Sequence, residues 1–179
     1  FNYINKGEDK MSFMSASGEL SVRKTDDLYE LDFPKDNIKK IDMMDEVEDS
    51  IGVRPIETYI GDINLFAILD NEETLKSLNP NFSKLINLDG QGLIVSSQSN
   101  EYDFVSRYFC PKFGIDEDPV TGSAHTTLIP YWSDKLNSSD MLAKQVSERG
   151  GVLHCKNQDT RVLIGGKAVL YMKGEIEVN

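Results

Sequence analysis

The chain has 179 residues, of which 39% are hydrophobic and 27% are charged, and its formal net charge at pH 7 is −11. This composition is typical of a soluble globular protein that buries one core, or one complete lobe and part of another. The negative charge repels phosphates, and no basic stripe with interleaved aromatic residues offsets it, so nucleic-acid binding is not expected. No apolar run approaches the ~20 residues of a membrane span, and we expect a cytoplasmic protein that binds no membrane.

The two cysteines, Cys110 and Cys155, are far apart and match neither a CxxC motif nor a zinc-ligand spacing. Two free thiols in a reduced compartment are the simplest interpretation. The sequence therefore predicts no disulfide and no metal site.

Short apolar runs separated by turn residues predict three strands, at 11–16, 19–24 and 28–33. The expected hairpin turns lie at Ser17-Gly18 and at residues 25–27. Such strands would form a meander, whose edges need a partner.

The next segment is polar and is expected to act as a linker. A helix follows, because four apolar residues lie on one helical face and Gly52 can end it. These four residues are Ile41, Met44, Val47 and Ile51. A buried strand at 63–69 comes next, followed by two short helices, of which the second is expected to be capped by Asn79 with Pro80 at its first position.

Strands are predicted at 92–98 and 102–109, and a helix at 122–136 that Pro130 should kink or divide. A further helix is expected at 139–147. Three short strands are expected to end the chain, with turns at Gly165-Gly166 and Lys173-Gly174. Many short strands with few helices favour an α+β protein over a parallel doubly wound sheet.

The segment Glu117–His125 combines an acidic pair, a proline, a glycine and small residues directly before a helix. The helix has two candidate starts, with Asp118 as cap before Pro119 or a few residues later at Thr121-Gly122-Ser123. Either start leaves unpaired N–H groups beside small side chains, which suits an anion. The segment is therefore either an ordinary capped loop or an anion site with an acid beside it.

Several neighbouring groups have both a functional and a structural interpretation. Arg107 and Arg149 could supply a cation for an anionic ligand, although ion pairs are the commoner use. His125 follows Ser123 by two residues and so points to another side of the helix, which argues against a hydrolase triad. Glu117 could point to solvent or balance a nearby cation, and Thr121 could donate to a ligand or to the backbone; both choices stay open.

Motifs along nearly the whole chain resemble the phenazine-biosynthesis PhzF-like isomerase family. They are Met11-Ser12-Phe13, Ser17-Gly18-Glu19-Leu20, Leu31-Asp32-Phe33-Pro34, Ser106-Arg107-Tyr108-Phe109-Cys110-Pro111, Gly114–His125, Tyr131-Trp132, Gln145, Ser147, Arg149-Gly150-Gly151, Arg161-Val162 and Gly165-Gly166. The family is similar in fold to diaminopimelate epimerase, with two lobes that face each other across a cleft. In each lobe a β-barrel-like sheet is wrapped round a central helix.

The resemblance implies a division of this chain between the two lobes. Residues 1–40 would be strands that complete a truncated first lobe, and 41–179 would form the second lobe, with its central helix near 122–136 and a last strand that returns to the first lobe. The family's principal catalytic glutamate and a Gly-His motif lie upstream of the part that resembles this chain, which opens at Phe1-Asn2-Tyr3-Ile4. We therefore expect a C-terminal portion with half an active site, which needs the missing N-terminal lobe segment as a partner.

The resemblance also implies an isomerase that transfers a proton on a small cyclic carboxylate, without metal or organic cofactor, in a homodimer. Asp118 would be the catalytic residue of this half, while Thr121, Gly122, Ser123 and Ala124 would bind the anionic substrate. Two other functions stay open. One is a non-catalytic carboxylate-binding or interaction protein of the same fold, and the other is an epimerase-like enzyme, which the lack of cysteine at 121–123 disfavours.

Overall fold

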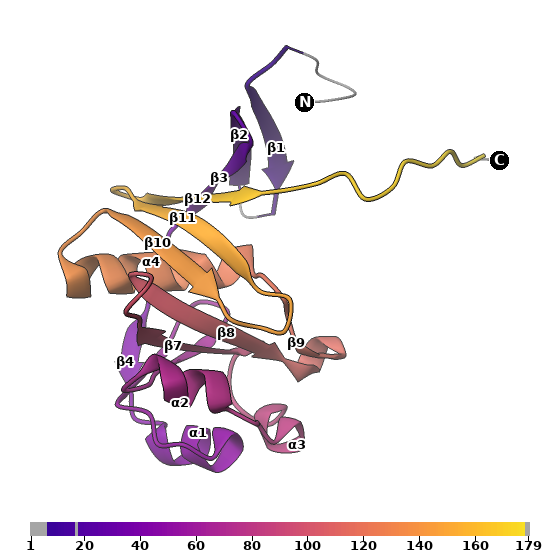
Figure 1. The fold of residues 1–179 in the computed structure, drawn as a ribbon. Coiled ribbons are helices and arrows are strands. Elements are labelled where there is room, and N and C mark those ends of the chain that lie inside the picture. Colours follow the sequence, from indigo (N-terminus) through magenta and orange to yellow (C-terminus); the bar gives the residue numbers. More distant parts are fainter. Residues whose placement is uncertain (1–6, 17, 178–179) are drawn as a thin grey trace.

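A computed structural model describes residues 7–16 and 18–177, which form one twelve-stranded mixed sheet and four α-helices (Figure 1). The strand order is β1-β2-β3-β12-β11-β10-β8-β7-β6-β5-β4, and β9 pairs with β8. The strands are β1 (Lys10–Ser15), β2 (Gly18–Thr25), β3 (Leu28–Pro34), β4 (Lys39–Ile41), β5 (Glu57–Ile60), β6 (Leu65–Ile68), β7 (Leu93–Gln98), β8 (Phe104–Cys110), β9 (Ile115–Glu117), β10 (Asp140–Gln145), β11 (Gly151–Asn157) and β12 (Arg161–Lys167). The helices are α1 (Met44–Ile51), α2 (Glu72–Ser77), α3 (Phe82–Leu85) and α4 (Gly122–Leu136).

The N-terminal meander is present as predicted. Strands β1, β2 and β3 are antiparallel neighbours, and Asp26 takes a positive φ of 55° in the second turn. Ser17, in the first expected turn, lies outside the described residues, as do residues 1–6 with the family-like opening Phe1-Asn2-Tyr3-Ile4. Figure 1 shows this meander projecting from the body of the molecule, which it joins through β12.

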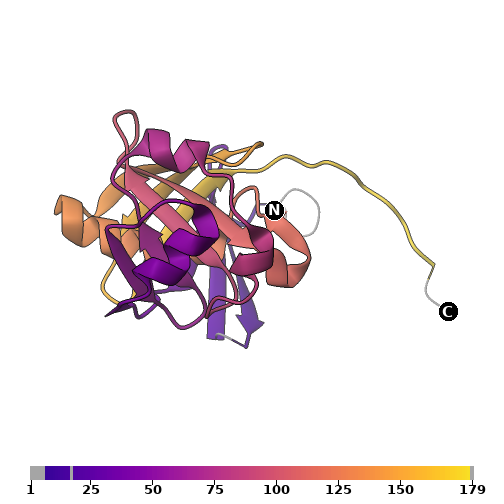
Figure 2. The same cartoon turned by 90° about the horizontal axis from the view of Figure 1, so that it is seen from below.

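Helix α4 is buried against one face of the sheet, and the three short helices cover the other face (Figure 2). The alternation of side chains along the central strands supplies both cores. On β6, Phe66 and Ile68 face α4, while Leu65 and Ala67 pack in the second core. Partly buried side chains of β3 and β5 also pack around α4, so the sheet encloses this helix from several sides.

Pro130 does not divide α4, which runs unbroken from Gly122 to Leu136. A proline at this position removes the N–H that would bond the carbonyl of Thr126. That carbonyl instead accepts from the backbone N–H of Asp36 at 3.3 Å, so a neighbouring segment replaces the lost partner.

The predicted helix at 139–147 is wrong, because this segment contains strand β10. Its buried residues Met141, Ala143 and Gln145 alternate with more exposed ones, as in a strand with one face against a core. Pairing with β8 on one side and β11 on the other satisfies its backbone. Tertiary pairing therefore overrides the local preference for a helix.

Two other local expectations are also wrong. Asn81, rather than Asn79, caps α3 by accepting from the N–H of Lys84 at 3.3 Å. Two strands, not three, follow β10 in the described residues up to 177, because Gly165-Gly166 lies inside β12 and residues 168–177 have no regular structure. No helix within 7–16 and 18–177 has the length and apolar character needed to cross a membrane.

Candidate functional site

The loop between β9 and α4 and the first turn of α4 together carry the predicted site residues. The helix uses the later of its two candidate starts, so Thr121 is the N-cap residue, and its side chain makes no cap hydrogen bond. Asp118 lies three residues before this N-cap, in the loop, and its backbone N–H donates to the carbonyl of Tyr108 at 3.0 Å. Asp118 is therefore held by the edge of β8, outside the helix.

The side chain of Asp118 belongs to a hydrogen-bond network with Thr121 and Gln145. The hydroxyl of Thr121 donates to Asp118 Oδ2. The Gln145 side chain accepts from the N–H of Thr121 at 2.8 Å, and it donates to the carbonyl of Asp118 at 2.7 Å and to Thr121 Oγ1 at 3.1 Å. One buried amide thus connects both ends of the turn that leads into α4.

His125 holds the same turn from the helix side. Its Nδ1 lies 2.7 Å from the carbonyl of Thr121, which can only accept, so Nδ1 carries the proton of a neutral ring. Complete burial lowers the pKa of His125 to about 4. His125 is therefore a neutral structural donor, in agreement with the structural interpretation of the sequence.

The first turn of α4 presents the groups predicted to bind an anion. The N–H groups of this turn have no intrahelical acceptor. Gly122 has no heavy atom within 4 Å of where a side chain would begin, and Ser123 is exposed, while Thr121 and Ala124 are buried. The side of the helix start at Gly122 and Ser123 is thus open, which is the arrangement a ligand needs.

A cavity of about 360 Å³ lies beside this helix start. It is lined by residues of the N-terminal meander, the β5–β6 turn and α4, namely Leu20, Phe33, Pro34, Lys35, Asp36, Asp62, Ile63, Asn64, Ser123 and Thr126. Ser123 belongs to both the cavity and the predicted cradle, whereas Asp118 is not among these lining residues. The predicted cradle therefore contacts this cavity through Ser123.

Asp36 fixes one wall of this cavity. Its carboxylate accepts from the hydroxyl of Thr127 at 2.6 Å and from the N–H of Asp62 at 2.9 Å, so it joins α4 to the β5–β6 turn. A Cβ at Gly61 would lie 2.1 Å from an Asp36 carboxylate oxygen, so a larger residue there would displace this carboxylate.

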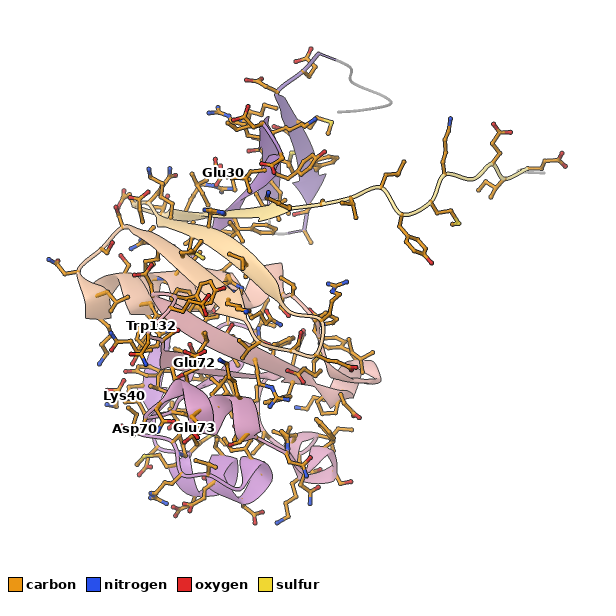
Figure 3. The ribbon with its side chains drawn as sticks, in the orientation of Figure 1. Glu30, Lys40, Asp70, Glu72, Glu73 and Trp132 are labelled. Atoms are coloured by element: carbon orange, nitrogen blue, oxygen red, sulfur yellow. The ribbon has the colours of Figure 1, made fainter. Side chains whose placement is uncertain are left out.

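A second cavity, of about 420 Å³, lies at the start of α2. Asp70, Glu72 and Glu73, labelled in Figure 3, are among its lining residues. Because three carboxylates would repel a carboxylate ligand, this cavity is a poor place for an anionic substrate. Trp132, also labelled there, contributes to the core of α4, where its Nε1 donates to Ser96 Oγ at 2.9 Å.

Arg107, which the sequence offered as a cation for an anionic ligand, forms an ion pair within the protein instead. Its guanidinium forms a bidentate pair with Glu117 at 2.8 Å for both bonds and donates to the carbonyl of Leu78 at 2.8 Å. These contacts link β8 to β9 and to the end of α2, so they settle Glu117 as its ion-pair partner. Arg149 is exposed.

The two cysteines are buried, which raises the pKa of Cys110 to about 11 and that of Cys155 to about 12. Thiols of this kind are poor acids and bases near neutral pH. Across residues 7–16 and 18–177, no three His, Cys, Asp or Glu side chains are grouped so that they could hold a metal ion.

Gln145 is the member of this network that the sequence did not assign to the site. It matched the family pattern, but its segment was expected to be helical. Sequence carries little signal for it, because Met141, Leu142 and Ala143 are consecutive apolar residues; only in the structure do Met141, Ala143 and Gln145 form the buried face of a strand. A buried amide must find partners, so this position indicates a specific hydrogen-bonding role.

Comparison with known proteins identifies the family. Residues 7–174 match the PhzC-PhzF family, described as phenazine biosynthesis-like protein. The chain belongs to this family. It is 38% identical over its whole length to an uncharacterized isomerase of Pseudomonas aeruginosa, covering 69% of that protein, and 43% identical to one of Halalkalibacterium halodurans, over 94% of this chain and 65% of that protein.

Solved structures agree with this assignment. A PhzF-family protein of Enterococcus faecalis is 46% identical and superposes with a TM-score of 0.91, over 99% of this chain and 68% of that one. A hydroxyproline epimerase of Agrobacterium vitis, with trans-4-hydroxy-L-proline bound, has a TM-score of 0.57 at 10% identity, which shows a shared fold alone. The expected α+β, epimerase-like fold is confirmed. The chain spans about two thirds of the length of these relatives.

Proposed function

We propose that this chain supplies half of the active site of an isomerase that moves a proton on a small cyclic carboxylate without a cofactor. The observation that carries the proposal is the placement of the Asp118 carboxylate, which Thr121 holds directly before the open first turn of α4. Relatives of this family are named isomerases, which supports the class of reaction.

Each group has a defined task in this proposal. The backbone N–H groups of Gly122, Ser123 and Ala124, with the Ser123 hydroxyl, hold the substrate carboxylate at the positive end of the helix. They also stabilise negative charge that develops when a proton leaves carbon. Thr121 orients Asp118, and Asp118 takes or returns the proton.

The other half of the site would come from a first-lobe segment that carries the principal base, a glutamate, and a Gly-His motif. Residues 1–40 would belong to that lobe and 41–179 to the second. Large exposed apolar side chains on β1 and on the segment after β12 support the idea that another segment packs against this part of the chain. Phe13 is 52% exposed, Met14 83% and Tyr171 98%. We further propose a cytoplasmic homodimer.

Proton exchange in D₂O tests the proposal without knowledge of the product. The chain is combined with the part of the Enterococcus faecalis relative that it does not cover, and small cyclic carboxylates are screened by ¹H NMR for loss of a C–H signal. We expect exchange with at least one compound, a loss of at least ~100-fold in Asp118→Asn, and no change in Asp116→Asn, an exposed neighbour on β9.

The controls separate the alternatives. Exchange by the 179 residues alone would contradict the need for an upstream base. Binding of a carboxylate that is unchanged in Asp118→Asn, with no exchange, would favour a non-catalytic binding protein. The epimerase-like alternative that uses two thiols has no support in this chain, since both cysteines are buried with raised pKa values.

A further inference from the structure

We propose that Gln145 is a positioning residue that sets the direction of the hydrogen bond from Thr121 to Asp118, so that a proton transferred to Asp118 is received on Oδ1. This inference rests on the proposed function in one respect, namely that Asp118 takes or returns a proton. The hydrogen-bond directions follow from the structure by themselves.

The backbone fixes the orientation of the Gln145 amide. The N–H of Thr121 can only donate, so the atom 2.8 Å from it is the carbonyl oxygen, Oε1. The carbonyl of Asp118 can only accept, so the atom 2.7 Å from it is the NH₂ nitrogen, Nε2. If the amide were rotated by 180°, its NH₂ group would face the N–H of Thr121 and its oxygen would face the carbonyl of Asp118. Neither pair can form a hydrogen bond, so both contacts would be lost.

This orientation decides what the Thr121 hydroxyl does. Nε2 has no lone pair to offer, so at 3.1 Å it donates its second hydrogen to Thr121 Oγ1. The single hydrogen of the hydroxyl is then directed to its other neighbour, Asp118 Oδ2. Oδ2 accepts this hydrogen bond, which lowers its basicity relative to that of Oδ1, so a new proton is received preferentially on Oδ1.

Burial makes the arrangement difficult to replace. Gln145 is fully buried on β10, and its neighbour across the parallel pair is Ser106 of β8. Water therefore cannot easily substitute for its amide. The carbonyl of Thr121 is held separately by His125, so every polar atom of Thr121 has a side-chain partner. Side-chain hydrogen bonds thus fix the conformation of the turn at Thr121.

Solution NMR of the labelled 179-residue chain tests the inference without any substrate. We expect a slowly exchanging hydroxyl proton of Thr121 with an NOE to the Nε2 protons of Gln145. Gln145→Glu keeps the acceptor for the Thr121 N–H but removes both donors, so this NOE and the slow hydroxyl exchange should disappear. Gln158→Glu, at an exposed position, is the matched control and should keep both.

A second pair of variants covers the case in which Gln145→Glu does not fold. Thr121→Ser keeps the hydroxyl and should keep the slow proton, whereas Thr121→Val keeps the shape and loses it. In the exchange assay, Thr121→Val should lower kcat at least ~10-fold with KM nearly unchanged, and Thr121→Ser should restore kcat.

The outcomes distinguish the two proposals. Gln145 Nε2 protons that exchange as fast as those of exposed Gln158, or a Thr121 hydroxyl proton that persists in Gln145→Glu, would overturn the inference. A failure of all carboxylates to exchange would refute the proposed function, while the NMR result would still decide the role of Gln145.

Discussion

The burial of His125 makes the stability of the fold depend on pH in a defined window. Its pKa falls from an ordinary 6.5 to about 4, because burial disfavours the charged ring, and the carbonyl of Thr121 opposes this only partly. In the unfolded chain the ring binds a proton below about pH 6.5. Between these two values the unfolded state binds more protons than the folded state.

The magnitude follows from the linkage between proton binding and folding. The free energy of unfolding should fall by about 1.4 kcal/mol for each pH unit lost in this window. Above about pH 6.5, neutral His125 costs the folded state nothing. By pH 4, the free energy of unfolding has fallen by about 3 kcal/mol on account of this residue. That is a large part of the ~5–15 kcal/mol that stabilises a typical domain. Glu57, whose pKa is lowered from 4.5 to about 2, adds its own loss only below about pH 4.5.

The assay is urea unfolding at several pH values from 7.5 to about 4.5, followed by the fluorescence of the single tryptophan. His125→Asn retains a donor for the Thr121 carbonyl but does not titrate, so its stability should be nearly independent of pH in this window. His154→Asn, at an exposed position on β11, should keep the wild-type slope. A wild-type slope in His125→Asn, with unchanged m-values, would refute the reasoning.

Two further outcomes are expected in the same chain. Arg107→Met should lower the free energy of unfolding by about 3 kcal/mol, because it leaves the mostly buried Glu117 unpaired. Adding Glu117→Gln should recover part of the lost stability. A loss below ~1 kcal/mol in Arg107→Met alone would contradict the prediction. Cys110 and Cys155 should not react with DTNB at pH 8 in the folded protein and should react fully in guanidinium, because both are buried with pKa values of about 11 and 12. Rapid labelling of either native thiol would show that its burial is wrong.

Much of the fold could be predicted from the sequence where the signal is local. The meander at β1–β3, the end of α1 at Gly52 and the span of α4 all follow from turn residues, apolar periodicity and small residues at a helix start. Gly52 takes the left-handed conformation, with φ 75°, that a helix end requires. The motif at 117–125 also gave the candidate site residues, and their roles stay a prediction.

The rest depended on contacts between distant segments. Strand β10 forms because β8 and β11 pair with both of its edges, which no pattern within 139–147 contains. For the same reason the sequence could not place Gln145 against Asp118, 27 residues away, or show that Arg107 is committed to Glu117.

The sequence by itself thus determined the chemistry available near α4: an acid, a hydroxyl and free amides within seven positions, Asp118–Ala124. Only the tertiary structure decided how these groups are oriented. Backbone and side-chain groups from β8 and β10 converge on one turn and fix its hydrogen bonds, and directions of this kind arise from packing in three dimensions, which local residue preferences do not encode.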